Sequence, residues 1–301
     1  MRTWHRTLLI LASVVLPAQT VQGQAVCSAP HSSPVLARGG TIKTLAPGSG
    51  WFQTSVFRQS SGAFFDPTGD RRPYLANGRA DTYSLYLTGA VGVVRGIDVW
   101  FQVPVHRLTF ADITGERARS GIGDPRASIR VSPQIFGTDA IPLAVRAGVK
   151  LPGTDFPVDP RVLPLGEGQR DWEVSLEAGQ GFGGPDLTGY VLGWVGYRWR
   201  ERNDETGRKP GDEAFAHAGF GVRWRSWHVE LAAEVMSGRP SERFGLELDT
   251  GRRQLLQIQP TLGFDLGRGT FEITAAVPLA GKNLPTGPGV SLGYRFAWGA
   301  Y

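Results

Sequence analysis

The last segment of the chain, residues 289–298, alternates apolar and polar side chains with a period of two. Successive side chains of an extended strand point to opposite faces, so one face here is wholly apolar and the other is small, polar or basic. The apolar face becomes more aromatic toward its end, from Val290 and Leu292 to Phe296 and Trp298. This pattern indicates a strand with lipid outside and water inside. Earlier segments should then show the same alternation.

The alternation recurs from Trp51 onward and predicts about twelve strands. The expected strands lie at about 51–58, 81–93, 97–106, 122–135, 141–150, 171–178, 187–200, 216–225, 228–235, 256–264, 271–279 and 289–298. Their connections alternate long and short without exception, which is typical of membrane barrels. The predicted fold class is therefore all-β, a transmembrane antiparallel up-and-down β-barrel. A glycine-rich soluble β-sandwich is the alternative, but it gives no reason for this regular phase.

The N-terminus predicts export from the cytoplasm. Arg2 and Arg6 precede a short apolar run, residues 8–16, and small residues follow it. That run is too short to span a bilayer as a helix. We expect a signal peptide over residues 1–25, cleaved near residue 23 or 25. Residues 26–50 should form an irregular segment, in the periplasm or inserted into the lumen, before a barrel over residues 51–301.

Aromatic residues near the expected strand ends predict two rims. If the short turns face the periplasm, one rim holds Trp51, Trp224, Trp227, Phe264, Phe271, Phe296 and Trp298, and the other holds Tyr83, Phe110, Trp172, Tyr197 and Trp199. Aromatic rings gather at both interfaces of a membrane. We therefore expect the outer membrane of a Gram-negative-type bacterium, with both termini periplasmic because the strand number is even.

The terminal strand carries a second signal. Ser291-x-Gly293-x-x-Phe296-x-Trp298 resembles the C-terminal recognition signal of bacterial outer-membrane barrels. The resemblance implies that the barrel assembly machinery is a partner through this strand. Outer-membrane lipid and lipopolysaccharide are the other expected macromolecular surroundings.

Inward positions on five neighbouring strands carry large aromatic and charged side chains. The candidate solute-contacting residues are Tyr86, Trp100, Arg126, Arg130, Arg146, Lys150, Glu173 and Glu177. The hairpin register predicts Lys150 near Asp171 or Glu173, and Arg146 near Glu177. One interpretation is a set of cross-strand ion pairs that stiffens the wall. The other is a path on which a ring contacts Tyr86 and Trp100 while an anionic group faces the arginines.

The sequence gives no sign of catalysis, a cofactor or a complete metal site. His106 could approach Asp124, but the nearest inward serine, Ser128, should lie too far away for nucleophilic catalysis. Cys27 and His31 make only two ligands, so we expect an inert thiol. Removing a signal peptide with two arginines lowers the formal net charge from +5 to about +3, which does not indicate nucleic-acid binding.

Several short motifs resemble one family. They are Gly121-Ile-Gly-Asp-Pro-Arg-Ala-Ser-Ile-Arg130, Leu143-Ala-Val-Arg-Ala-Gly-Val-Lys-Leu-Pro-Gly153, Leu165-Gly-Glu-Gly-Gln-Arg-Asp-Trp-Glu-Val174 and Val195-Gly-Tyr-Arg-Trp199. In this order they are similar to the outer-membrane barrels of the MetA-pathway of phenol degradation family. The resemblance implies transport of small, often apolar or aromatic compounds and supplies no catalytic residues.

We therefore expect a channel or transporter for small solutes, including aromatic or amphipathic ones. The alternative is a barrel with no transport role, acting as a structural or surface-interaction protein through its long connections. Those connections are 59–80, 152–169, 201–212 and 238–253.

Overall fold

The computed structural model describes residues 44–138, 141–154, 156–157, 159, 162–184 and 187–299. The expected signal peptide, Cys27 and most of the irregular segment lie outside these ranges. Within them, no helix is long and apolar enough to cross a membrane.

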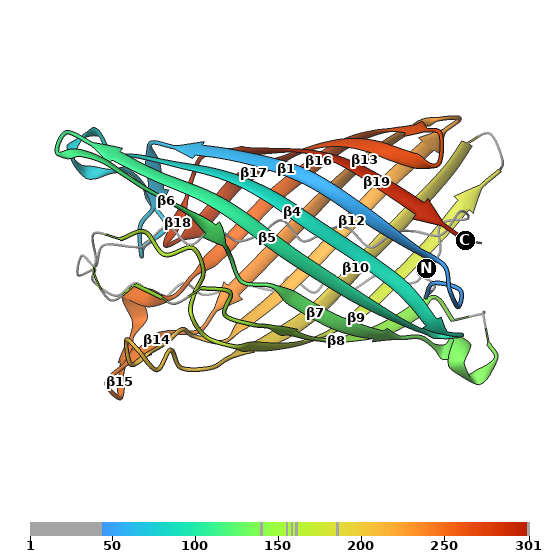
Figure 1. The fold of residues 1–301 in the computed structure, drawn as a ribbon, viewed down its shortest axis with the longest axis horizontal. Helices are drawn as coiled ribbons and strands as arrows, with labels where there is room; N and C mark the ends of the chain where they lie inside the picture. Colours follow the sequence, from blue (N-terminus) through green and yellow to red (C-terminus); the bar gives the residue numbers. More distant parts are fainter. Residues whose placement is uncertain are drawn as a thin grey trace, which may run out of the picture.

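The described residues form a closed antiparallel barrel of twelve strands, as the sequence predicts (Figure 1). Its wall consists of β1 (Gly50–Ser61), β4 (Arg79–Val94), β5 (Ile97–Asp112), β6 (Gly115–Ile122), β7 (Arg126–Val131), β8 (Leu143–Lys150), β9 (Asp171–Gly183), β10 (Leu187–Arg200), β12 (Glu213–Trp224), β13 (Trp227–Gly238), β16 (Gln254–Leu266), β17 (Gly269–Lys282) and β19 (Gly289–Trp298). Both β6 and β7 pair with β5, so they are two parts of one wall strand. The barrel closes because β1 pairs with β4 on one side and with β19 on the other.

Short elements decorate the connections. They are β2 (Ala63–Phe65), β3 (Arg71–Pro73), η1 (Leu75–Asn77), η2 (Pro133–Phe136), β11 (Arg208–Lys209), β14 (Ser241–Arg243), β15 (Leu246–Leu248), η3 (Asp249–Gly251) and β18 (Leu284–Pro285). All except η2 lie at one end of the barrel, on the left in Figure 1, whereas β1 begins and β19 ends at the other. We call these the long-loop end and the short-turn end.

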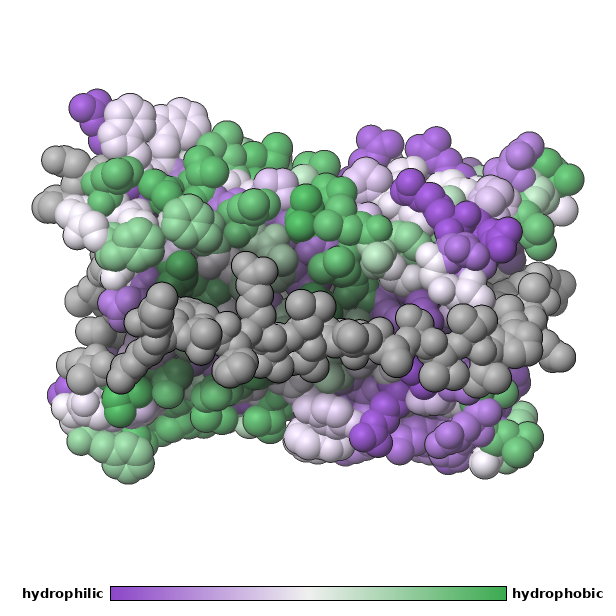
Figure 2. Space-filling view, turned by 180° about the vertical axis from the view of Figure 1, so that it is seen from behind, coloured by the Kyte–Doolittle hydropathy of each residue, from purple (hydrophilic) through white to green (hydrophobic). Residues whose placement is uncertain are grey.

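The two faces of the wall are those that the alternation predicts. Val99, Val145 and Leu231 point outward and expose 40%, 47% and 56% of their surface. Asp98 and Trp100, on the opposite face of β5, are buried inside the barrel. Figure 2 shows apolar residues spread over the body of the barrel and polar residues gathered toward the long-loop end. An apolar outer surface of this kind is what a membrane barrel presents to lipid.

One expected long connection does not exist as a loop. The sequence predicts a break between about residues 107 and 121, but β5 and β6 continue there as a paired hairpin with a two-residue turn at Ile113 and Thr114. The apolar outer surface forms a belt around the barrel. Beyond this apolar belt the outward face of a strand no longer needs apolar side chains, so the alternation fades while the backbone pairing continues. The prediction of unbroken long and short alternation is wrong at this connection.

Two aromatic residues lie inside the barrel rather than on its rims. Trp51 is only 1% exposed and packs edge-on against Trp100, with ring centroids 5.0 Å apart. Phe110 contacts Tyr74 next to η1, with ring centroids 5.5 Å apart. The prediction that Trp51 and Phe110 lie near strand ends is correct. The alternation of side chains along their strands, however, turns both of them inward. Most of the other expected rim residues, such as Trp172 and Trp298, are exposed.

The segment before β1 enters the short-turn end of the lumen. Leu45 packs in a buried cluster with Trp51, Ala90 and Trp100, and the amide of Gly48 donates to the carbonyl of Gly92 at 2.9 Å. A Cβ on Gly92 would lie 2.1 Å from the carbonyl oxygen of Ala46. A residue without a side chain is therefore required where the segment crosses β4.

Candidate functional site

A buried carboxylate, Asp98, organises the short-turn end of the lumen. It is fully buried and accepts hydrogen bonds from the Leu45 amide at 2.9 Å, from Trp100 Nε1 at 2.7 Å and from Arg130 Nη2 at 2.7 Å. Arg130 Nε also lies 3.1 Å from the other carboxylate oxygen, so this pair is bidentate. Asp98 thus links the segment before β1, through Leu45, to Trp100 and to Arg130 of the barrel wall.

From Arg130 the network continues across the lumen wall. Arg130 Nη1 lies 3.4 Å from Glu177, which also pairs with Arg146. The guanidinium of Arg146 lies over the Trp100 ring, 4.1 Å from its centroid. A cation–π contact therefore holds Arg146 against Trp100.

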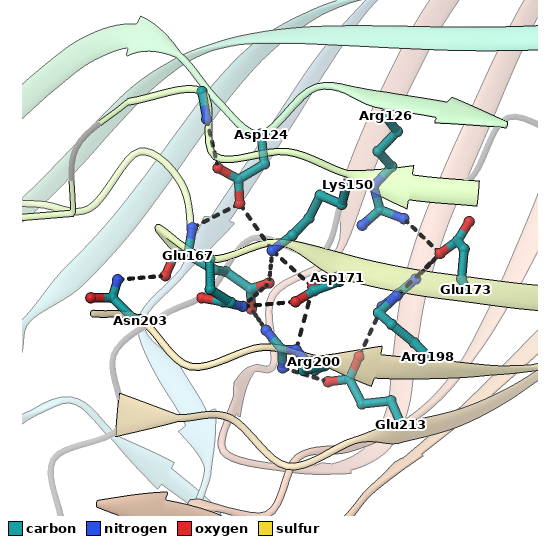
Figure 3. Close-up of polar contacts among 12 residues, drawn as sticks. Asp124, Arg126, Lys150, Glu167, Asp171, Glu173, Arg198, Arg200, Asn203 and Glu213 are labelled. Carbon is teal, nitrogen blue, oxygen red and sulfur yellow. Dashed lines mark hydrogen bonds and ion pairs between the residues drawn. The ribbon is translucent and has the colours of Figure 1, made fainter. Parts of the chain in front are cut away.

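A second network fills the long-loop half of the lumen (Figure 3). Lys150 Nζ lies within 3.1 Å of three carboxylates, those of Asp124, Glu167 and Asp171. Arg200 pairs with Glu167 and Asp171 and, at 3.0 Å, with Glu213. These residues come from β8, β9, β10 and β12 and from the connections beside β7 and β9, so the ion pairs tie four neighbouring wall strands together.

Glu167 brings the connection between β8 and β9 into this network. Its carboxylate contacts Lys150 at 2.6 Å, Arg253 at 3.0 Å and also Arg200, and its amide donates to Asp124 at 2.8 Å. Burial alone would raise the pKa of this carboxyl, but the three cations hold it well below its usual range. The connection is therefore clamped over the lumen by a charged carboxylate.

The depressed pKa of Glu167 predicts a pH-dependent clamp. Stability from a lowered carboxyl pKa is complete above the ordinary value, about 4.3, and is lost as the pH falls through the folded-state value. Glu167→Gln should therefore lower the free energy of unfolding by about 1–3 kcal/mol at pH 7, with a difference from wild type that shrinks under acid conditions. Urea unfolding of the detergent-folded protein across pH measures this. Glu242→Gln, which alters the exposed pair with Arg202, is the control; an effect of Glu167→Gln that is the same at every pH contradicts the clamp.

Two cavities lie along the lumen. The outer cavity, beneath the long loops, has about 1240 Å³ of space free of atoms, counting the part open to solvent. The middle cavity has about 650 Å³ on the same measure. Among the described residues, Arg126 alone lines both. It pairs with Glu173 at 3.7 Å, and Arg198 approaches the same carboxylate at 3.1 Å.

The outer cavity carries an excess of positive charge. Seven basic and four acidic side chains line it: Arg126, Lys150, Arg198, Arg200, Arg208, Arg239 and Arg253, against Asp124, Glu167, Glu213 and Glu234. Low-dielectric walls strengthen the field of such a surplus. Asp171 and Glu173 also pair with four of these cations, so the surplus is smaller than the lining alone gives and favours small anions only modestly.

The structure brings together five of the eight candidate residues around the middle cavity: Trp100, Arg126, Arg146, Glu173 and Glu177. Lys150 lines the outer cavity, where it contacts Asp171 as the register predicts. Two candidates line neither cavity. Tyr86 is 1% exposed and packs against Phe57, and Arg130 is 1% exposed beneath Asp98.

Sequence reasoning missed the wall opposite Trp100. Trp194 on β10 and Phe215 on β12 line the middle cavity there, and Trp194 stacks on His217 with ring centroids 3.7 Å apart. The signal was present, because Trp194 shares the parity of the inward Arg198 and Arg200 on the same strand. Apolar and charged side chains on one parity made that strand look irregular, although both kinds face the lumen.

The histidine expected near Asp124 has a different serine partner. His106 Nδ1 lies 2.7 Å from Ser84 Oγ, because Ser84 is directly opposite His106 on β4, so Ser128 is not the nearest serine. The Asp124 carboxylate is held by Lys150 and by the amides of Gly153 and Glu167. Across the described part of the chain, no group of three or more His, Cys, Asp or Glu side chains is arranged to hold a metal ion.

No family model matches the chain, and no curated protein matches it in sequence. Its structure is similar to that of an outer membrane channel from Pseudomonas putida F1, with a TM-score of 0.67 and 16% identity over 85% of this chain and 98% of that one. The chain shares the fold of that channel. The β domain of the Bordetella autotransporter BrkA (TM-score 0.47, 14% identity, 84% and 100% of the two chains) and the translocator domain of the autotransporter NalP from Neisseria meningitidis (0.46, 12%, 85% and 91%) are more distant.

Proposed function

We propose that this barrel is an outer-membrane channel that passes small aromatic or amphipathic solutes and prefers anions. The observation that carries the proposal is the pair of cavities that meet at Arg126. A barrel stiffened only by ion pairs has no need for open space in mid-lumen, nor for indole and phenyl faces beside it.

The middle cavity has the chemistry to hold such a solute. Trp100 on β5 and Trp194 on β10 both line it and add apolar indole surface that a ring can contact. Arg126 and Arg146 lie beside them and can receive an anionic group by charge-assisted hydrogen bonds. The solute path therefore differs from the one predicted from the sequence, because Trp194 takes the place of Tyr86.

Passage requires the ion pairs between the cavities to rearrange. Glu173 accepts from Arg198 and pairs with Arg126, so these three side chains separate the two spaces. An anion that enters from the positively charged outer cavity can replace Glu173 as the partner of Arg126. Exchange of one carboxylate for another keeps the guanidinium paired throughout.

The proposal includes the place of the barrel in the cell. The apolar outer surface supports insertion in an outer membrane, with the short turns and both chain ends on the periplasmic side. Lipid and lipopolysaccharide would surround the wall, and the assembly machinery would recognise β19.

Neutralising the arginines of the middle cavity should change ion selectivity. We expect wild-type protein in a planar bilayer under a KCl gradient to prefer chloride, and Arg126→Gln with Arg146→Gln to shift the reversal potential toward potassium selectivity. The control is Arg72→Gln with Arg268→Gln, which removes two exposed charges outside the lumen. If selectivity stays unchanged while the melting temperature falls, the residues form a structural network and the path is wrong.

The alternative function is a structural or surface-interaction barrel. Liposome swelling with small aromatic acids separates the two, because a barrel without a transport role should not speed their entry at any protein density. Such a result, with correctly folded protein, would favour the alternative.

A further inference from the structure

A row of three exposed side chains marks the edge of the apolar outer surface that is nearer the long-loop end, on one side of the barrel. The register places Arg58 of β1 opposite Tyr83 of β4, and Tyr83 opposite Arg107 of β5. All three point outward and are exposed. They form a basic row with an aromatic centre on the outer wall.

The row lies where the lipid-facing surface ends. From the short turn, the outward residues of β5 are all apolar until Arg107; they are Ile97, Val99, Phe101, Val103 and Val105. The next outward row toward the short-turn end is Val56, Leu85 and Val105, in register across the same strands. Acyl chains would cover that apolar row, so Arg58 and Arg107 stand at the level of the headgroups.

The two arginines differ from three others near this end. Arg72, Arg79 and Arg117 each lie within 4.0 Å of an aspartate. Within the described residues, no ion pair joins Arg58 or Arg107 to an acid; Arg58 lies over the Tyr83 ring, 5.3 Å from its centroid. Their charges are therefore available to a ligand outside the protein.

The distance between the two arginines and the ring between them indicate the kind of ligand that would bind. Arg58 and Arg107 stand two strand spacings apart, about 10 Å. A guanidinium binds phosphate in a bidentate manner, and an aromatic ring at the interface suits a sugar or headgroup between them. We propose that this row binds a phosphorylated glycolipid of the outer leaflet, a lipid A type headgroup, with its phosphates on the two arginines and its acyl chains along Val56, Leu85 and Val105.

The site depends on the outer-membrane placement proposed above but not on solute passage. The experiment measures retention of bisphosphorylated lipid A by the detergent-folded full chain, using native mass spectrometry with a lipid titration. Arg58→Gln with Arg107→Gln should weaken binding at least tenfold. Arg225→Gln with Arg268→Gln, two exposed arginines at the short-turn end, should leave it unchanged. Bilayer conductance of the same variants should be unaffected, which separates this site from the channel.

Three competitors test the source of the phosphate. Lipid A that lacks one phosphate should bind more weakly, while phosphatidylethanolamine and inorganic phosphate should compete poorly. Equal binding of phosphatidylethanolamine would mean a general lipid shell, and full competition by inorganic phosphate would mean a simple anion site. Either result, or undiminished binding by the folded double variant, overturns the proposal.

Discussion

Replacing Asp98 with alanine should lower the free energy of unfolding by about 3–5 kcal/mol, because it leaves the buried guanidinium of Arg130 without its bidentate partner. The same change removes the acceptors of the Leu45 amide and of Trp100 Nε1. We therefore expect residues 44–49 to be released from the short-turn end, with faster hydrogen exchange at Leu45 and a larger bilayer conductance.

Asp249→Ala is the matched control for Asp98. It removes a carboxylate 3.3 Å from Arg252, but the pair lies at the surface, where such contacts are worth about 0–1 kcal/mol. Chemical unfolding in detergent measures both variants. If the two changes cost the same, Asp98 does not organise this end of the lumen.

Placing arginine at Leu231 should cost about 2–4 kcal/mol, because Leu231 projects from the middle of β13 into the region that lipid tails occupy. Its neighbours in the register, Phe220 and Pro260, give the charge no partner. Reversible unfolding from phospholipid vesicles measures the difference.

Gln102→Arg is the control for the outer face. Gln102 faces the middle cavity, which polar and charged side chains line, so we expect a mild effect. Equal destabilisation at Leu231 and Gln102 would contradict the assignment of faces and, with it, the membrane barrel.

Much of the architecture could be predicted from the sequence because lipid imposes a strict rule on each strand. A residue inside the apolar belt must be apolar when it faces outward, so parity alone placed Val99, Arg126 and Glu177 correctly. The same parity, combined with hairpin geometry, predicted Lys150 near Asp171 or Glu173 and Arg146 near Glu177. The structure pairs Lys150 with Asp171 and Arg146 with Glu177.

What the sequence could not predict lies where that rule does not apply. The lumen accepts both apolar and charged side chains, so Trp51 and Trp194 gave no clear signal although they face inward. The clamp by Glu167 depends on a connection that folds back over the lumen, and no periodicity describes such a path. Beyond the belt, the β5–β6 hairpin continues through backbone pairing, which does not depend on alternation.

The contact between β1 and β19 constrains how the molecule can form. Gly50 pairs with Trp298, and the ten pairs of this seam join the two ends of the wall across nearly the whole sequence. Contacts of such long range form slowly, because the intervening chain must be ordered first. Until β19 arrives, β1 and β17 present unpaired edges that can recruit another chain. A partly assembled barrel therefore needs protection of these edges. Once β19 pairs with both strands, no open edge is left for another chain to bind.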